Sequence, residues 1–400
     1  MPDGDGAIEL SLVERIRDIA AADWDACAGA NGQVGNPFVG HAFLSALEES
    51  GSVGAATGWM PRHLVARGGD GATLGVVPLY VKGHSYGEYV FDHGWADAYE
   101  RAGGRYYPKL QAAVPFTPVP GPRLLARPGA GGDAVRAALA EGLAEVTRRL
   151  GLSSAHVTFC NEDEALLMQA AGFLLREGTQ FHWNNQGYAT FDDFLGQLAS
   201  RKRKQLRKER RDALAGGISI SRLSGPTLTS KAWDAFFRFY IATSDRKWGS
   251  PYLNREFFDL LGERMGDRVV LVMAAKDGQY IAGALNLRGD EALYGRNWGS
   301  RGEWPYLHFE CCYYQAIEYA IEHRLARVEA GAQGPHKIQR GYLPAPTWSA
   351  HFIADPRLRS AIADYLKRER GAVARERVEL MEHSPYRCTE HDGPDETPLG

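Results

Sequence analysis

Residues 269–289 read VVLVMAAKDGQYIAGALNLRG, with two hydrophobic runs on either side of the turn sequence KDG. This pattern predicts a β-hairpin. The earlier stretch HLVARGGDGATLGVVPLYVKG, at 63–83, has the same order of strand, glycine-containing turn and strand. Similar helical segments precede both hairpins, HAFLSALEESGS at 41–52 and REFFDLLGERMG at 255–266. The offsets, about 207 residues in the hairpins and 214 in the helices, predict a duplicated domain, because solenoid repeats are much shorter.

The segments after each hairpin predict one order of elements in both halves: strand, helix, strand, helix, strand. In the first half these are expected at 87–95, 133–151, 154–160, 162–172 and 173–183. In the second half they are expected at 291–300, 307–324, 325–332, 336–342 and 347–353. The expected fold class is therefore α/β (α+β), with a mixed sheet flanked by helices in each domain. We place the domains at 1–186 and 187–387, with a basic helix over 200–215 and a disordered polar tail at 388–400.

The composition is that of a globular protein, with 44% hydrophobic and 24% charged residues in a chain of 400. Its five cysteines include no CxxC pair, which argues against a disulfide framework and for a reducing compartment. The N-terminal sequence has no signal-peptide pattern, and no apolar run is long enough to span a membrane. We expect a cytoplasmic protein. No metal-ligand spacing such as HExxH occurs, so we expect neither a metal nor a cofactor.

Three long stretches carry a family resemblance: residues 84–125, which include GEYVFDHGWADAY, residues 292–300, ALYGRNWGS, and residues 307–344, which include LHFECCYYQAIEYAIEHR. Together with the basic stretch SRKRKQLRKERR, they resemble the FemAB-like family of predicted N-acyltransferases, described as peptidoglycan biosynthesis or recognition proteins. The resemblance covers about 10–385. One departure is Asn297, where the family usually has an aromatic residue. The resemblance implies two tandem acyltransferase domains of the GNAT fold.

The resemblance also implies a reaction, transfer of an activated acyl or aminoacyl group to an amine. Aminoacyl-tRNA is the candidate donor and a cell-wall precursor the candidate acceptor. Two alternatives stay open, an acyl-CoA-dependent N-acetyltransferase and a non-catalytic protein that binds a cell-wall precursor. A CoA enzyme needs a glycine-rich loop to hold the pyrophosphate. The loops FTPVPGPRLLARPGAGG (116–132) and SRGEWPY (300–306) have prolines and bulky residues in the corresponding places, which disfavours acetyl-CoA.

The stretch SRKRKQLRKERR, at 200–211, has eight basic residues and one acidic residue, in a chain of net charge −3. It is either a solvated helix that packs through Leu206 and its arginine stems, or a grip for the phosphates of tRNA, of a nucleotide-linked precursor or of a phosphopantetheine donor. The phosphate-binding candidates are Arg203, Lys204, Arg207 and Lys208. A general DNA- or RNA-binding function is disfavoured because the rest of the chain is acidic.

N-acyl transfer requires a base for the amine and stabilisation of the carbonyl oxygen. Glu310 shares a largely apolar face of the expected helix 307–324, which predicts a raised pKa and suits a general base. Its alternative is a first-turn glutamate favoured by the helix dipole. His308, on another face, is a candidate proton shuttle or a structural residue. Glu329, at the end of the next strand, is the second candidate base.

The densest polar cluster is EAGAQGPHKIQRGY at 329–342, where a strand ends and a short helix begins. Such a position is a favoured ligand site. The alternative is a capped turn with an ion pair from Glu329 to Lys337 or Arg340. The substrate-binding residues expected in the second half are Arg296, Trp298, Tyr314, Gln333, His336, Lys337 and Arg340. Those expected in the first half, around the acceptor, are Asp92, His93, Trp95, Tyr99 and Lys109.

Overall fold

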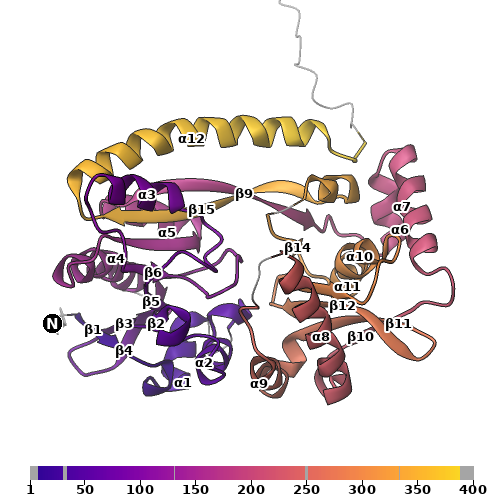
Figure 1. Ribbon diagram of the computed structural model, residues 1–400, viewed down its shortest axis with the longest axis horizontal. Coiled ribbons are helices and arrows are strands. Elements are labelled where there is room, and N and C mark those ends of the chain that lie inside the picture. The colour runs from indigo at the N-terminus through magenta and orange to yellow at the C-terminus, as the bar shows by residue number, and fades with distance from the viewer. Residues whose placement is uncertain (1–7, 30–33, 130, 248–250, 333, 388–400) are drawn as a thin grey trace, which may run out of the picture.

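Both repeated hairpins form as the sequence predicts. In the computed structural model, β3 (His63–Arg67) pairs antiparallel with β4 (Thr73–Val77), and β11 (Val269–Lys276) pairs antiparallel with β12 (Gln279–Arg288). The two hairpins lie in opposite halves of the molecule (Figure 1). The structure describes residues 8–29, 34–129, 131–247, 251–332 and 334–387. Gln333 and the tail at 388–400 therefore lie outside the described residues.

The strands form two sheets, one of four strands and one of eleven. The smaller sheet has the order β1 (Glu9–Val13), β3, β4, β7 (Leu125–Ala126). The larger sheet has the order β10 (Ser219–Leu223), β11, β12, β13 (Ala292–Ser300), β14 (Arg327–Glu329), β9 (Leu174–Asn184), β15 (Leu343–Ile353), β8 (Ser154–Cys160), β6 (Lys109–Ala112), β5 (Leu79–Lys82), β2 (Trp59–Pro61). The larger sheet thus runs through both halves without a break.

The closing strand of the second half lies inside the sheet of the first half. β15 pairs antiparallel with β8 on one side and with β9 on the other, so that Ala350 is opposite both Val157 and Leu175. β9 in turn pairs with β14 of the second half. The domain boundary at 186/187 remains a prediction, because each half supplies a strand on which the other half's sheet depends.

Helices cover both faces of the central strands. The first-half helices are α1 (Ala21–Ala28), α2 (His41–Glu49), α3 (His93–Arg101), α4 (Gly132–Arg149) and α5 (Glu162–Ala170). The later helices are α6 (Phe191–Gln197), α7 (Ser200–Ala213), α8 (Ser230–Lys247), α9 (Arg255–Met265), α10 (Leu307–Phe309), α11 (Gln315–Glu322) and α12 (Pro356–Glu382). None of the described helices is long and apolar enough to cross a membrane.

Each face of the central strands has its own chemistry. Apolar side chains of α4 and α5 pack on one face, where Leu143 and Met168 share a core with Val157. On the other face, α3 and α12 contribute Trp95 and Leu366 to a smaller cluster, and α12 runs along β9 and β15 (Figure 1). This second face also bears polar side chains, which makes it the place to look for a site.

The helices of the sequence repeat, α2 and α9, pack against each other. The rings of Phe43 and Phe257 meet edge to face at 5.7 Å, and Arg264 binds Ser45 at 3.0 Å and also pairs with Glu49. A single core includes side chains of both helices and of both hairpins. The duplicated elements therefore hold the two halves together.

Two local departures from the expected elements matter for the site. The prediction of a strand at 87–95 is wrong. Residues 84–92 form a loop, with positive φ at Gly87 and Tyr89, and α3 begins at His93. The helix expected at 307–324 does form, but residues Glu310–Tyr314 make one π-helical turn within it. Turns of this kind occur frequently at functional sites.

Candidate active site at the centre of the sheet

Three polar side chains form a row on neighbouring central strands. Glu329 is the last residue of β14 and lies opposite His182 of β9, and Gln180 is two residues before His182, on the same face. The Nε2 atom of His182 is 4.0 Å from Oε2 of Glu329 and 3.2 Å from Oε1 of Gln180. Gln180 donates to the carbonyl of Pro118 at 2.8 Å, which fixes its orientation.

Glu329 has the electrostatics expected of a general base. Burial raises its pKa to about 7, although the guanidinium of Arg327 at 2.8 Å opposes the shift. Arg327 binds Oε1, whereas Oε2 has no hydrogen-bond partner among the described residues. Burial lowers the pKa of His182 to about 4, so this imidazole is neutral near pH 7. The prediction that Glu329 is a candidate base is therefore consistent with its surroundings.

The sheet opens beside Glu329. β14 ends at this residue, whereas β13 continues to Ser300 and has no partner strand on that side among the described residues. A β-bulge in β13 leaves Arg296 as the extra residue between Gly295 and Asn297, which pair with consecutive residues of β12. Bulges concentrate next to active sites, where they redirect a side chain. Glu329 and Arg296 thus flank the point where the two strands part.

Arg296 faces the first half of the molecule. Its Nη2 atom donates to the carbonyl of Phe116 at 2.5 Å and lies 3.4 Å from the hydroxyl of Thr117. Burial lowers the pKa of this guanidinium. No described carboxylate forms an ion pair with it, and its described partners are a carbonyl and a hydroxyl. A guanidinium held in this way keeps its charge available to an anion or a developing oxyanion.

A cleft of about 240 Å³ lies over the polar face of β9 and β15. Gln180 lines it, and thereby connects the cleft with His182 and Glu329. Loop residues 89–91 form one wall, and Arg176, which binds the carbonyl of Phe91, and Glu369 also line the cleft. The remaining lining residues are Phe159, Glu177, Gly178, Thr179, Ala332, Thr347, Trp348 and Ser349. The cleft is large enough for the end of a small polar substrate and is bordered by aromatic side chains.

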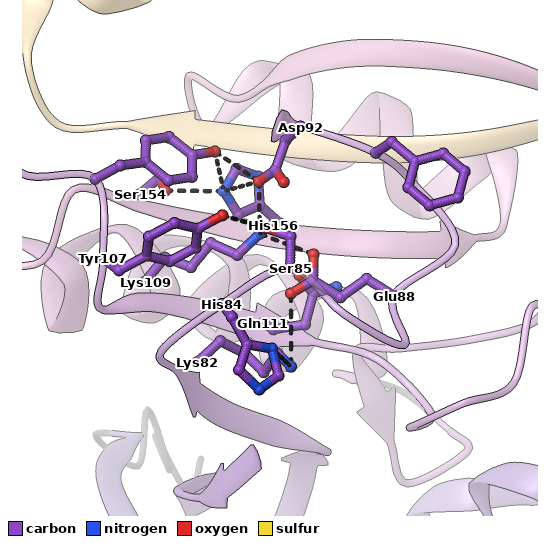
Figure 2. A network of polar contacts seen from close by, with 12 residues as sticks. Lys82, His84, Ser85, Glu88, Asp92, Tyr107, Lys109, Gln111, Ser154 and His156 are labelled. Carbon is purple, nitrogen blue, oxygen red and sulfur yellow. Dashed lines mark hydrogen bonds and ion pairs between the residues drawn. The ribbon is translucent and has the colours of Figure 1, made fainter. Parts of the chain in front are cut away.

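A buried polar network lies beneath the loop 84–92 (Figure 2). The ammonium of Lys109 donates to Asp92 at 2.5 Å, to Glu88 at 2.7 Å and to Ser85 at 2.8 Å. Burial alone would raise the pKa of Asp92, but Lys109 holds it well below the usual value. Burial raises the pKa of Glu88 to about 7 and lowers that of Lys82 to about 7. The structure therefore brings together Asp92 and Lys109, two of the residues predicted to surround the acceptor.

The other predicted acceptor residues lie around this network. The ring of Trp95 is buried and contacts Arg176 at 5.1 Å and His351 at 5.0 Å. His93 is exposed and stacks on Phe91 at 6.0 Å. Tyr99 is half-buried in the apolar cluster beneath α12. Their roles in substrate binding remain predictions. Trp95 and His93 each contact a residue that lines the cleft, Arg176 and Phe91 respectively.

The sequence predicted that Glu310 would lie on a largely apolar helix face. In the structure it instead lies among charged and polar partners. It is fully buried, and the guanidinium of Arg210 binds both of its oxygens, at 2.9 and 3.1 Å. Gln315 donates to it at 2.9 Å, and Arg210 also binds Glu318. These contacts fasten the π turn to α7, so the structure favours a structural role for Glu310.

His308 and Trp298 lie together at a second cleft, of about 430 Å³. Their rings meet edge to face at 5.2 Å. Trp304 and Glu303, from the loop before α10, line the same cleft. The structure thus places His308 in contact with Trp298, at a cleft that Glu329, His182 and Gln180 do not line.

Among the described residues of the cluster at 329–342, the side chains of His336, Lys337 and Arg340 all bind groups other than the Glu329 carboxylate. Arg340 pairs with the buried Glu209 at 2.9 Å, and Tyr314 donates to the same carboxylate. His336 hydrogen-bonds Tyr313 at 3.1 Å. Lys337 donates to the carbonyls of residues 330 and 331, and burial lowers its pKa to about 8. The alternative ion pair from Glu329 to Lys337 or Arg340 is therefore wrong.

The basic helix α7 has an inner and an outer face. Leu206 and Glu209 are buried, and Arg210 points inward to Glu310. Of the predicted phosphate-binding residues, Lys204, Arg207 and Lys208 are exposed and Arg203 is half-buried. Arg207 pairs with the exposed Asp192 at 2.8 Å. One face of the helix therefore packs, as the first interpretation predicts, and the other presents cations to solvent. Phosphate binding by this outer face remains a prediction.

Sequence reasoning missed Gln180, His182 and the inward pair Glu209 and Arg210. The signals were present. QFHW, at 180–183, alternates polar and apolar residues and so places Gln180 and His182 on one face of a strand. Leu206, Glu209, Arg210 and Ala213 follow the spacing of one helical face, but charged residues are not expected on a buried stripe.

Comparison with known proteins agrees with the sequence resemblance. The FemAB-like family, described as peptidoglycan biosynthesis/recognition, matches residues 15–388. No curated protein sequence matches the chain. The solved structure of FemX has a TM-score of 0.53 and 14% identity, and the match covers 89% of this chain and 100% of FemX.

Two further solved structures match most of the chain. The structure of L-PGS from Bacillus licheniformis has a TM-score of 0.51 and 9% identity, with 84% of this chain and 98% of that chain covered. A tandem GNAT protein from the clavulanic acid biosynthesis pathway has a TM-score of 0.45 and 14% identity, with 88% and 99% covered. The predicted fold class, α/β with mixed sheets flanked by helices, is confirmed, and the fold resembles that of FemX.

Proposed function

The chain belongs to the FemAB-like family, and from this membership and the central site we propose that it is an N-acyltransferase acting on a cell-wall precursor. The donor is an activated acyl or aminoacyl ester, with aminoacyl-tRNA as the first candidate. The acceptor is an amine that enters the cleft over β9 and β15. The observation that carries this proposal is Glu329, a buried carboxylate with a pKa raised to about 7, at the point where β13 and β14 part.

The reaction follows from what these groups can do. The acceptor amine attacks the carbonyl carbon of the donor ester, so a C–N bond forms and the C–O bond breaks. Glu329 takes the proton that the amine loses, with His182 as the relay to its Oε2 atom, and returns this proton to the departing oxygen as the C–O bond breaks. Arg296 provides positive charge for the developing oxyanion. A base with a pKa near the working pH is the most effective choice for such a transfer.

The exposed face of α7 is the proposed contact for the donor. Lys204, Arg207 and Lys208 point to solvent from one helix, and clustered cations bind the phosphates of nucleic acid with an affinity that falls as salt rises. Arg203, at the edge of this face, completes the predicted set. The inward contacts of Glu209 and Arg210 hold the helix in place while its outer face remains available.

The test offers the purified full chain three donors in separate reactions: a mixture of charged tRNAs, the same tRNAs uncharged, and acetyl-CoA. The acceptor probe is UDP-linked muramoyl pentapeptide, and mass spectrometry detects the added group. We expect an aminoacyl mass increase with charged tRNA alone. An acetyl increase would favour the CoA alternative, and precursor binding without any transfer would favour a non-catalytic binding protein.

A further inference from the structure

We infer that Lys109 is a positioning residue: it holds the loop 84–92 so that residues 89–91 form one wall of the cleft. The inference rests on the proposed function only for the identity of the ligand, an amine acceptor. Lys109 itself is fully buried and does not line the cleft, so it acts through the loop and not by touching the substrate.

The three donors of one ammonium are all used by the loop. A lysine ammonium has three N–H groups, and those of Lys109 bind Ser85, Glu88 and Asp92, which span the loop from near its start to its end. Figure 2 shows these residues converging on the Lys109 side chain. One buried point on β6 therefore fixes the loop at three places.

The charges under the loop leave it little freedom. Lys82 and Lys109 lie directly opposite each other on β5 and β6, and both are fully buried. Like charges in such a pair repel. Glu88 and Asp92 supply the compensating negative charge, with Glu88 2.7 Å from Lys109 and 3.9 Å from Lys82. Displacing the loop would leave buried charges without partners, which is strongly unfavourable.

The second lysine holds the backbone of the loop. Lys82 donates to the carbonyl of Tyr86 at 3.1 Å, and its ammonium lies 3.8 Å from the centre of the Trp59 ring. Tyr107 hydrogen-bonds Ser85 at 2.8 Å, and Tyr106 donates to Asp92 at 2.6 Å. The contacts to the loop therefore come from β5 and from residues 106 and 107, just before β6.

The residues between the anchors form the wall. Only residues 89, 90 and 91 separate Glu88 from Asp92, and all three line the cleft. Tyr89 has a φ of 61°, a conformation that a non-glycine residue adopts only when its surroundings hold it there. On the cleft side, Arg176 donates to the carbonyl of Phe91 at 2.7 Å. The position of this wall is thus set by the buried ammonium beneath it.

The test compares Lys109→Met with the wild type and with Glu48→Gln as matched control. Glu48 contacts the buried His63 at 2.7 Å, away from the loop, so its substitution disturbs a buried pair without releasing the wall. The first measurement is amide hydrogen exchange of residues 84–92, with β8 as internal reference. We expect exchange in the loop to accelerate about tenfold or more in Lys109→Met, with β8 unchanged, and not in Glu48→Gln.

The second measurement is calorimetric binding of UDP-linked muramoyl pentapeptide, together with KM and kcat of the transfer reaction. We expect Kd and KM for the acceptor to rise about tenfold and kcat to change by less than about threefold, because the wall contributes binding and not chemistry. If Lys109→Met does not fold, Ser85→Ala and Glu88→Gln each remove one contact of the same ammonium and should give smaller shifts in the same direction.

Three outcomes would overturn the inference: unchanged exchange of the loop, a faster loop with unchanged acceptor binding, or an equal effect of Glu48→Gln. Failure of the proposed function is a different result. In that case the wild type neither binds nor modifies the muramoyl probe, while the exchange of residues 84–92 still decides whether Lys109 fixes the wall.

Discussion

At the scale of single residues, the proposed chemistry depends on the carboxylate of Glu329, whose charge is unfavourable in its buried position. Burying Glu329 favours its protonated form, and Arg327 compensates only part of that cost. A structural ion pair would engage both oxygens, whereas Oε2 here has no described hydrogen-bond partner. The arrangement is that of a group held ready to exchange a proton near neutral pH.

We expect Glu329→Gln to lower kcat by about a hundredfold or more, because the amine then has no base of suitable pKa. The wild-type rate should rise with pH through about 7 and level off above it, since only the deprotonated carboxylate accepts a proton. Glu291→Gln is the control, because Glu291 also binds Arg327 but is exposed. A variant that keeps both its rate and this pH profile would remove Glu329 from the mechanism.

The same substitution should stabilise the protein at alkaline pH. The pKa of Glu329 is raised from 4.5 to about 7 in the folded state, so its contribution to stability is fully present below 4.5 and is lost as pH rises through 7. At pH 8 the buried charge costs up to about 3 kcal/mol. Urea unfolding at pH 8 should therefore show Glu329→Gln to be more stable by about 1–3 kcal/mol, with a smaller gain at pH 5. A loss of stability at pH 8 would mean that the Arg327 ion pair dominates.

Some residues of the candidate site could be predicted from the sequence and others could not, depending on whether a local sequence pattern marks them. Glu329 could be proposed because it ends a strand before a polar turn. His182 and Gln180 carried only an alternating pattern, and their importance depends on β14 lying beside β9, a pairing of distant segments. Glu310 was placed correctly on its helix, but its partner Arg210 lies 100 residues away in sequence and could not be inferred from local spacing.

At the scale of elements, α7 combines two roles on two faces. Arg210→Met would leave the buried Glu310 without its guanidinium, which typically costs about 3–5 kcal/mol. Urea denaturation should show this loss, and the added change Glu310→Gln should recover part of it, because the unpaired charge is then gone. If the double variant keeps its transfer activity, Glu310 is structural. A loss of activity at restored stability would return it to the mechanism.

The outer face of the same helix should affect binding without affecting stability. We expect Ala substitutions at Arg203, Lys204, Arg207 and Lys208 to weaken binding of charged tRNA about tenfold or more and to flatten its salt dependence. The control replaces four exposed basic residues of α12: Arg357, Lys367, Arg368 and Arg375. Unfolding free energies of both variants should stay close to that of the wild type. An equal loss in the two would indicate a general charge effect and no specific surface.

The loop 84–92 shows why one element could not be read from the sequence. GEYVFDHGW has the hydrophobic content of a strand and was expected to form one. In the structure, Glu88 and Asp92 lie in a loop and not in a strand, and their carboxylates pair with two lysines from neighbouring strands. Ion pairs between residues distant in sequence determine the conformation of this loop, and the β-strand propensity of its residues does not account for such contacts.

At the scale of the whole molecule, the duplicated pattern predicted the class of fold and the two hairpins, because both depend on local periodicity. It did not predict where the closing strand goes. β15 belongs by sequence to the second half, yet it joins β8 to β9 of the first. Strand order in a mixed sheet is set by long-range pairing, which leaves no mark in the local pattern of a single sequence.

This exchange predicts that the halves depend on each other. Residues 1–186 alone would lack β15 and leave two long strand edges unpaired, so we expect them to aggregate or stay unfolded by circular dichroism and size-exclusion chromatography. Coexpression with residues 187–387 should restore a soluble complex, and residues 1–186 linked to 343–382 should fold better than 1–186 alone. A monomeric fragment 1–186 with a cooperative thermal transition would show that β15 is dispensable there and that the boundary at 186/187 separates independent domains.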